Sequence, residues 1–181
     1  MPGWSSGTAD PSGSRAAAGS RRGGHKPRPG TLAETRFGAR LPLAAQARLE
    51  PQMRIVEYAP GAEILREGDP TDVLGIVRRG RAAVRLRVPE RGPTTILTVE
   101  PGDILGWSAV VPPHRATSTV VALQPTEVLS MPGAALRAEL EADPLLAAAV
   151  YRALLEALSR RLIGTRMQLL DLFTTTGADP W

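Results

Sequence analysis

Short apolar runs separated by turn residues fill the middle of the chain. Gly and Pro between these runs supply tight reversals, because Gly permits positive φ and Pro presets φ. One run, Ala82–Val88, alternates, with apolar residues on one face and Arg85 and Arg87 on the other. The pattern predicts β-strands with one buried face, as in an antiparallel roll or sandwich. The predicted strands are Met53–Tyr58, Ile64–Arg66, Val73–Arg79, Ala82–Val88, Thr94–Val99, Thr117–Leu123 and Glu127–Met131.

Helical periodicity flanks the strand region on both sides. A short amphipathic helix is predicted for Leu41–Glu50, a second for Gly133–Asp143, and a long helix from Pro144 to about Phe173. The long helix carries apolar positions in alternating steps of three and four, a heptad stripe typical of paired helices. This stripe predicts a parallel homodimer. Its seam is Ala148, Tyr151, Leu155, Leu158, Leu162, Thr165, Leu169 and Leu172, with the five leucines from Leu155 onward as interface residues.

Composition divides the chain into a basic tail and a nearly neutral remainder. Residues 1–30 are rich in Gly, Ser, Pro, Ala and Arg and show no periodicity, so a disordered basic tail is predicted. Residues 1–40 carry seven basic and two acidic groups, whereas residues 41–181 carry 15 Arg and 16 acids. The folded part therefore lacks the positive excess that marks a nucleic-acid-binding surface.

Several classes of site are disfavoured by what the sequence contains. There are no cysteines, which excludes disulfides, thiolate metal sites and cysteine nucleophiles. The two histidines, His25 and His114, are far apart, so no metal site is expected. No apolar run approaches the ~18 residues of a membrane span, and the first residues do not resemble a signal peptide. A cytoplasmic protein with no membrane association is predicted.

An ordered set of motifs resembles a known family. Tyr58–Asp69 spells YAPGAEILREGD, Pro101–Gly106 spells PGDILG, Thr119–Leu123 spells TVVAL, and a long helix follows. This set resembles the cyclic nucleotide-binding domain of the catabolite activator family and of cyclic-nucleotide-dependent kinases and channels. The resemblance implies a mainly β fold: an eight-stranded β-roll, or jelly roll, with a short N-terminal helix and a long C-terminal dimerisation helix. The implied boundaries are residues 1–30 for the tail, 31–143 for the roll, 144–173 for the long helix and 174–181 for a C-terminal tail.

In that family a short cassette holds the cyclic phosphate. A Gly-Glu pair opens a small helix, an Arg about nine or ten residues later binds the phosphate, and the Glu accepts from the ribose 2′-OH. Here the cassette segment, Leu105–Thr117, spells LGWSAVVPPHRAT. Gly106 is in place, but Trp107 stands at the Glu position and offers only an N–H donor. Arg115 comes one or two positions early, and Ala116 aligns with the usual Arg.

The resemblance implies candidate ligand-binding residues and leaves their roles open. Trp107 either stacks on a flat ligand or fills the pocket from within. Thr165 matches the position at which the family's Thr reaches adenine across the dimer, or it sets helix register as a polar seam residue. The ligand is a cyclic nucleotide, a related anionic small molecule, or none. The candidate ligand-binding residues are Gly106, Trp107, Ser108, Arg115 and Thr117.

The function predicted from these features is that of a non-catalytic sensor or adaptor. No Ser-His-Asp order, phosphate loop or metal set is present, so no enzyme is predicted. The chain ends eight residues after Phe173, which leaves no room for a helix-turn-helix domain, so direct sequence-specific DNA binding is not expected. Two alternatives stay open. One is a catabolite-activator-like regulator acting through its basic tail or a DNA-binding partner. The other is a ligand-free module that binds protein partners.

Overall fold

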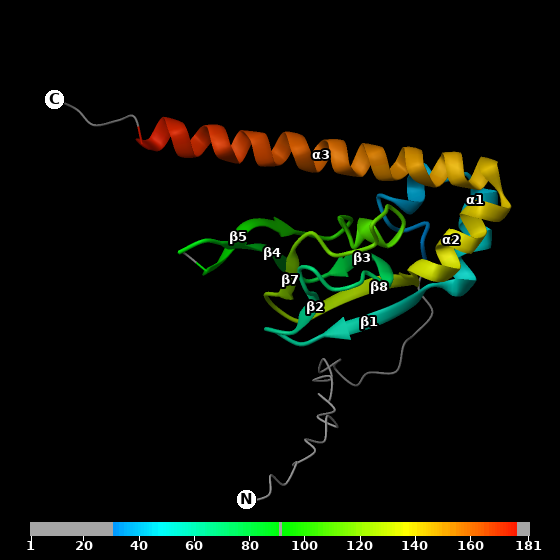
Figure 1. Cartoon of the computed structure of the whole chain (residues 1–181). Helices are drawn as coiled ribbons and strands as arrows, with labels where there is room; N and C mark the ends of the chain where they lie inside the picture. Colours follow the sequence, from blue (N-terminus) through cyan, green and yellow to red (C-terminus); the bar gives the residue numbers. More distant parts are fainter. Residues whose placement is uncertain (1–30, 91, 177–181) are drawn as a thin grey trace, which may run out of the picture.

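The protein forms two antiparallel sheets that face each other, with helices along one side (Figure 1). The computed structural model describes residues 31–90 and 92–176, with side chains to residue 167. The tail predicted for residues 1–30 lies outside the described residues. The sheets have the strand orders β1-β8-β3-β6 and β2-β7-β4-β5. The strands are β1 Arg54–Tyr58, β2 Glu63–Leu65, β3 Val73–Arg79, β4 Ala82–Val88, β5 Gly92–Val99, β6 Ile104–Leu105, β7 Thr119–Ala122 and β8 Thr126–Pro132.

The predicted fold class is confirmed. Eight strands form a roll that is preceded by a short helix and followed by a long one. The helices are η1 Gly38–Arg40, α1 Leu43–Leu49, η2 Glu50–Gln52, η3 Trp107–Ala109, α2 Gly133–Ala142 and α3 Pro144–Thr176. None of the helices in the described part of the chain combines the length and apolarity needed to cross a bilayer.

One of the eight strands, β6, is not among the seven strands predicted from apolar runs. It has only two residues, Ile104 and Leu105, which pair with Ile76 and Gly75 of β3. Two residues cannot display an alternating pattern. β6 forms because the β5–β6 turn brings these residues alongside β3.

Burial along β4 differs from the predicted alternation. Ala83, expected on the wet face, has no exposed surface, like Ala82 beside it. β4 lies between β5 and β7, so Thr98 and Val121 flank the small Ala83 side chain from both sides. Leu86 is only half-buried, because the β4–β5 hairpin extends beyond the rest of the sheet (Figure 1). The predicted alternation therefore fails at Ala83 and Leu86, whereas Ala82 and Val84 are buried and Arg87 is exposed, as predicted.

Two hydrophobic clusters hold the roll and the helices together. The smaller one lies between the sheets and contains Val77, Val99, Leu105 and Val128. The larger one joins β1, β3 and β8 to the helices, and α3 contributes the buried residues Leu146, Val150, Ala153 and Leu154. The first half of α3 is thus part of the core.

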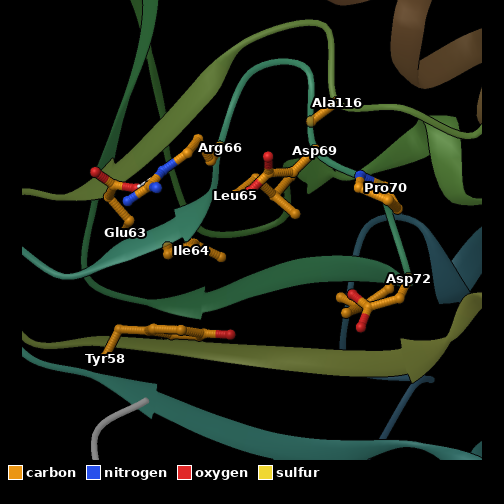
Figure 2. Close-up of a pocket in the computed structure, with 10 residues that line it drawn as sticks. Tyr58, Glu63, Ile64, Leu65, Arg66, Asp69, Pro70, Asp72 and Ala116 are labelled. Atoms are coloured by element: carbon orange, nitrogen blue, oxygen red, sulfur yellow. Dashed lines mark hydrogen bonds and ion pairs between the residues drawn. The ribbon is translucent and has the colours of Figure 1, made fainter. Parts of the chain in front are cut away.

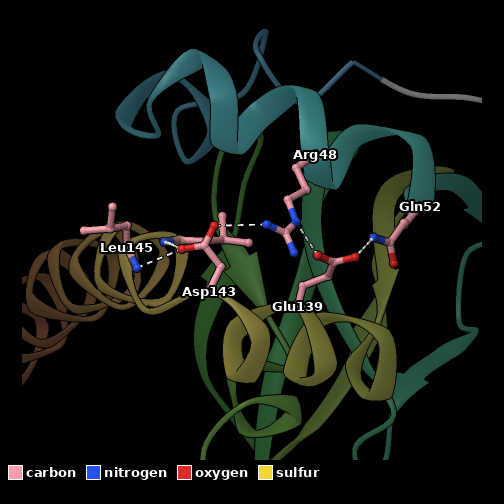
Figure 3. A network of polar contacts seen from close by, with 6 residues as sticks. Arg48, Gln52, Glu139, Asp143 and Leu145 are labelled. Carbon is pink, nitrogen blue, oxygen red and sulfur yellow. Dashed lines mark hydrogen bonds and ion pairs between the residues drawn. The ribbon is translucent and has the colours of Figure 1, made fainter.

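Polar contacts fix where α3 begins (Figure 3). The Asp143 Oδ1 accepts the backbone N–H groups of Leu145 and Leu146 at 3.0 and 3.1 Å, which caps the helix ahead of Pro144. Arg48 of α1 donates to both Glu139 and Asp143, and Gln52 donates to Glu139 at 2.8 Å. The hydrogen bond from Arg48, followed by that from Gln52, lowers the pKa of the Glu139 carboxyl. These contacts connect α1 and η2 to the end of α2 and the start of α3.

Candidate functional site

The cassette segment begins with a glycine that no other residue can replace without strain. Gly106 has φ 68°, and a Cβ there would lie 2.2 Å from the Val73 carbonyl oxygen. Positive φ is costly for residues with a Cβ, and a contact this short requires backbone movement. Gly106 therefore determines where β6 ends and η3 begins.

Buried and partly buried contacts join η3 to the segment before β3 and to α2. The Ser108 hydroxyl donates to Thr71 Oγ1 at 2.9 Å, and the two side chains are 4% and 3% exposed. Arg137 of α2 donates to the Ala109 carbonyl, and a Cβ on Gly133 would lie 3.0 Å from the Ala109 Cβ. The start of α2 thus lies directly against η3. Ser108, a candidate ligand-binding residue, thus already makes a buried hydrogen bond within the protein.

Trp107 is half-buried and packs against the larger hydrophobic cluster, on the helix side of the first sheet. Its ring is positioned by packing, in keeping with the interpretation that it fills space within the fold. The stacking role stays a prediction.

The second half of the cassette segment is tied to the turn that follows β2. Arg115 is exposed, and its Nη1 donates to the Gly68 carbonyl at 2.8 Å. The Ala116 N–H donates to the Asp69 carbonyl at 2.9 Å. His114 Nδ1 lies 3.2 Å from the Ser108 carbonyl oxygen, which links the two halves of the segment. A guanidinium has five N–H donors, so Arg115 retains donors for an anion.

A cavity of about 210 Å³ opens between the two sheets beside this turn (Figure 2). None of the five candidate ligand-binding residues is among its described lining residues. Ala116, at the position of the family's Arg, does line it, together with Tyr58, Glu63, Ile64, Leu65, Arg66, Asp69, Pro70, Asp72 and Val73. Arg66 is paired with Glu63 at 2.8 Å, so the remaining ionisable lining is acidic. This cavity disfavours an anion.

Thr165 lies at a different place, in a groove of about 220 Å³ between α3 and the turn from β5 to β6. It is half-buried, and its hydroxyl donates to the Arg161 carbonyl at 2.9 Å. No described residue lining this groove belongs to the cassette segment. The lining residues are Arg36, Leu97, Thr98, Gly102, Asp103, Ile104, Ala157, Arg160, Arg161, Gly164 and Thr165.

The outer face of α3 leaves an apolar stripe uncovered. Tyr151, Leu155 and Leu162 are 41%, 65% and 52% exposed, although all are large and apolar. Leu158 is half-buried and packs against the larger cluster. The side chains of the other two predicted interface residues, Leu169 and Leu172, lie outside the described residues.

Sequence reasoning did not single out Arg36, Thr71, Arg137 or Arg161. One signal was available for Arg161, which follows the core-facing Ala153 and Ala157 at steps of four, on the same face of the helix. Asp103 pins the turn between β5 and β6, because its Oδ2 accepts the Glu100 N–H at 2.9 Å. Among the described residues, no cluster of three or more His, Asp or Glu side chains could hold a metal ion.

Comparisons with known proteins point to one family of binding domains. Residues 55–143 match the family model of the cyclic nucleotide-binding domain. The chain is 29% identical over 132 residues to a CRP-like cAMP-activated global transcriptional regulator of Mycobacterium tuberculosis, covering 73% of this chain and 57% of that protein. It is 34% identical over 94 residues to the acetyltransferase Pat of Mycolicibacterium smegmatis, covering 52% of this chain and 28% of that protein. The chain thus spans little more than half the length of the first relative.

A solved structure shows the same architecture. The crystal structure of a putative cyclic nucleotide-binding protein from Geobacter metallireducens superposes with a TM-score of 0.67 at 25% identity. The superposition covers 74% of this chain and 97% of that one. The similarity therefore extends over nearly all of the Geobacter protein.

Proposed function

The chain belongs to the cyclic nucleotide-binding domain superfamily, and on that premise we propose that it is a non-catalytic sensor. It binds a small anionic ligand of the nucleotide type at the cassette segment and signals through α3. The observation that carries this proposal is the attachment of the cassette segment at both ends. Arg115 contacts the turn after β2, and Ala109 contacts α2. A ligand that moves the segment also moves α2, and with it the start of α3.

Arg115 is the residue proposed to meet the anion. It is exposed, and its contact with the neutral Gly68 carbonyl leaves its charge uncompensated. An anion offers it a charge-assisted hydrogen bond, which is stronger than one to a neutral carbonyl. Ligand binding would therefore draw the Arg115 guanidinium toward the anion and shift the cassette segment relative to the turn. Because Trp107 replaces the family's Glu, this site would bind the ribose less specifically than its relatives.

Calorimetric titration of the full chain with cAMP and with cGMP tests the proposal. We expect saturable binding of at least one nucleotide, weakened roughly tenfold or more in Arg115→Ala because a charge-assisted hydrogen bond is lost. Arg79→Ala is the matched control, since Arg79 is an exposed arginine of the roll at the end of β3. The proposal fails if the folded protein gives no binding heat, or if Arg115→Ala binds as the native chain does.

We also propose that the sensor is a parallel homodimer paired along the exposed stripe of α3. Two leucines, Leu155 and Leu162, are seven residues apart and both exposed, as the seam of a two-helix coiled coil requires. Sedimentation equilibrium of Leu155→Glu/Leu162→Glu should show a shift from dimer to monomer. The exposed Leu43 of α1 provides the control Leu43→Glu, which should remain dimeric. A native chain that sediments as a monomer contradicts the pairing.

A second candidate function follows from the similarity to the Mycobacterium tuberculosis relative, a cAMP-activated transcriptional regulator. In this alternative the chain acts on DNA through residues 1–30 or through a DNA-binding partner. An electrophoretic shift that weakens steeply with salt, and disappears when residues 1–30 are deleted, would favour the tail. DNA binding that survives the deletion would contradict a tail-dependent mechanism.

A further inference from the structure

We propose that the groove between α3 and the β5–β6 turn is a second binding site, specific for a compact phosphate-type anion such as pyrophosphate. Arg36, Arg160 and Arg161 would hold the anion. This site goes beyond the proposed function, because it takes a different ligand and none of its three arginines belongs to the cassette segment, although the candidate ligand position Thr165 also lines the groove.

The groove concentrates positive charge that the described residues do not balance. Three arginines line it, and Asp103 is the one acid among its described lining residues. The side chains of Arg36 and Arg160 form no ion pair or hydrogen bond with any other described residue. The groove therefore carries a net charge of about +2, and an anion would bind there with favourable Coulombic energy.

Arg161 is the most deeply placed of the three. It is half-buried, and it donates to the Ile104 carbonyl, which is a neutral acceptor. Burial lowers the pKa of its guanidinium, and the nearby Asp103 carboxylate opposes that effect. Asp103 also accepts a hydrogen bond from the Glu100 N–H, so its carboxylate interacts with both Glu100 and Arg161. A partly buried charge with an incomplete counter-charge is destabilising, and an anion in the groove would relieve that cost.

Arg36 reaches the groove because a glycine lies under it. Gly102 has φ +92°, and a Cβ there would lie 3.0 Å from both Cγ and Cδ of Arg36. The Arg36 side chain therefore rests across the β5–β6 turn, where a bulkier residue would displace it. The three guanidinium groups thus come from two elements far apart in the chain, the segment before α1 and the middle of α3.

The size of the groove indicates the class of ligand. At about 220 Å³ it is smaller than the ~300–1,000 Å³ typical of pockets for drug-sized ligands. Phosphate and pyrophosphate are compact enough and match the bidentate geometry of guanidinium groups. The hydroxyl of Thr98, on β5, adds a further donor at the lining.

The position of the groove suggests what binding would do. Beyond Leu158, the Arg161–Ile104 contact is the one hydrogen bond that joins the described side chains of α3 to the roll. An anion bound by Arg36 and the two α3 arginines would add a second connection between α3 and the roll at the same position along the helix. Binding would hold the middle of α3 against the roll.

Titration of the full chain with sodium pyrophosphate, in a low-salt buffer free of phosphate, tests the site. Calorimetry should give saturable binding, and amide resonances of Gly102 and Gly164 should shift in two-dimensional NMR spectra. The double variant Arg36→Ala/Arg160→Ala should lose at least tenfold in affinity. Both side chains are exposed, so the variant should stay folded. Arg79→Ala, which alters an exposed arginine outside the groove, should bind as the native chain does, and Arg115→Ala reports any anion bound at the cassette segment.

Two kinds of result would overturn the inference. One is the absence of saturable binding, or a loss in Arg79→Ala as large as in the double variant, which would indicate binding to surface charge in general. The other is a loss in Arg115→Ala with full binding in the double variant, which would place the anion at the cassette segment. Failure of the cyclic nucleotide titration alone would leave the groove proposal intact, because the two sites share no residue.

Discussion

Replacement of Gly106 by alanine tests whether the left-handed glycine is required at the start of η3. The Ala methyl would lie 2.2 Å from the Val73 carbonyl oxygen, whereas real Cβ contacts essentially never fall below 3.0 Å. Either β3 or the cassette segment must therefore move by most of an ångström. The matched control is Gly61→Ala. Gly61 has a similar φ of +81°, but nothing lies within 4 Å of the position that a methyl group would take there.

The two substitutions share one cost and differ in another. A residue with a Cβ in the left-handed region costs about 1–2 kcal/mol, and about 0.4–1 kcal/mol of this is offset because alanine restricts the unfolded chain. Gly61→Ala should therefore destabilise the protein by about 1 kcal/mol. Gly106→Ala adds an overpacking cost of about 1–3 kcal/mol, for a total of about 2–4 kcal/mol.

Urea unfolding at one fixed protein concentration measures the difference, because oligomerisation would otherwise make the midpoint concentration-dependent. We expect Gly106→Ala to lower the free energy of unfolding by about 1–3 kcal/mol more than Gly61→Ala does. The difference should lie toward the upper end of this range if the cassette segment cannot shift. Equal losses in the two variants would refute the reasoning, since they would mean that the Val73 carbonyl does not constrain the segment.

Two further predictions concern contacts that hold the cassette and α3 in place. Because the pKa of Glu139 is lowered in the folded state, its charge stabilises the protein above the ordinary carboxyl pKa, and this contribution is lost as the pH falls through the folded value. Glu139→Gln should therefore be less stable than the native chain at pH 7, and thermal melts should show the difference shrinking below about pH 4. Ser108→Ala removes the donor to the buried Thr71 hydroxyl and should cost about 1–2 kcal/mol. A double-mutant cycle with Thr71→Val should give a non-zero coupling energy, and additive losses would contradict the bond.

Local pattern was enough to predict much of the framework. β3 and β4 occupy the predicted residues, Val73–Arg79 and Ala82–Val88, because apolar runs bounded by turn glycines leave few other places for strand ends. α3 starts at Pro144, as predicted, and Asp143 supplies the cap. β6 could not be predicted from periodicity, since its two residues pair only where β3 already offers a sheet edge.

The sequence indicated where along the chain the candidate site lies, but not which side chains line the cavity. The motif order places the cassette segment at the end of β6, where Gly106 has a positive φ of 68°. Tertiary contacts decided which side chains face the cavity and which do not. Arg115 is held by Gly68, and Ala116 lines the cavity in its place. These orientations follow from the register of the segment against the turn after β2, which no local pattern records.

The sequence by itself determined most of the elements, because periodicity, glycine turns and helix caps act over a few residues, and its motif order indicated the family. The tertiary structure alone decided the two charged environments, the acidic cavity at Asp69 and Asp72 and the basic groove at Arg36 and Arg161. Charges interact through space, so their effect depends on which distant segments the fold brings together. Arg36 and Arg161 meet only because the segment before α1 and the middle of α3 both reach the β5–β6 turn.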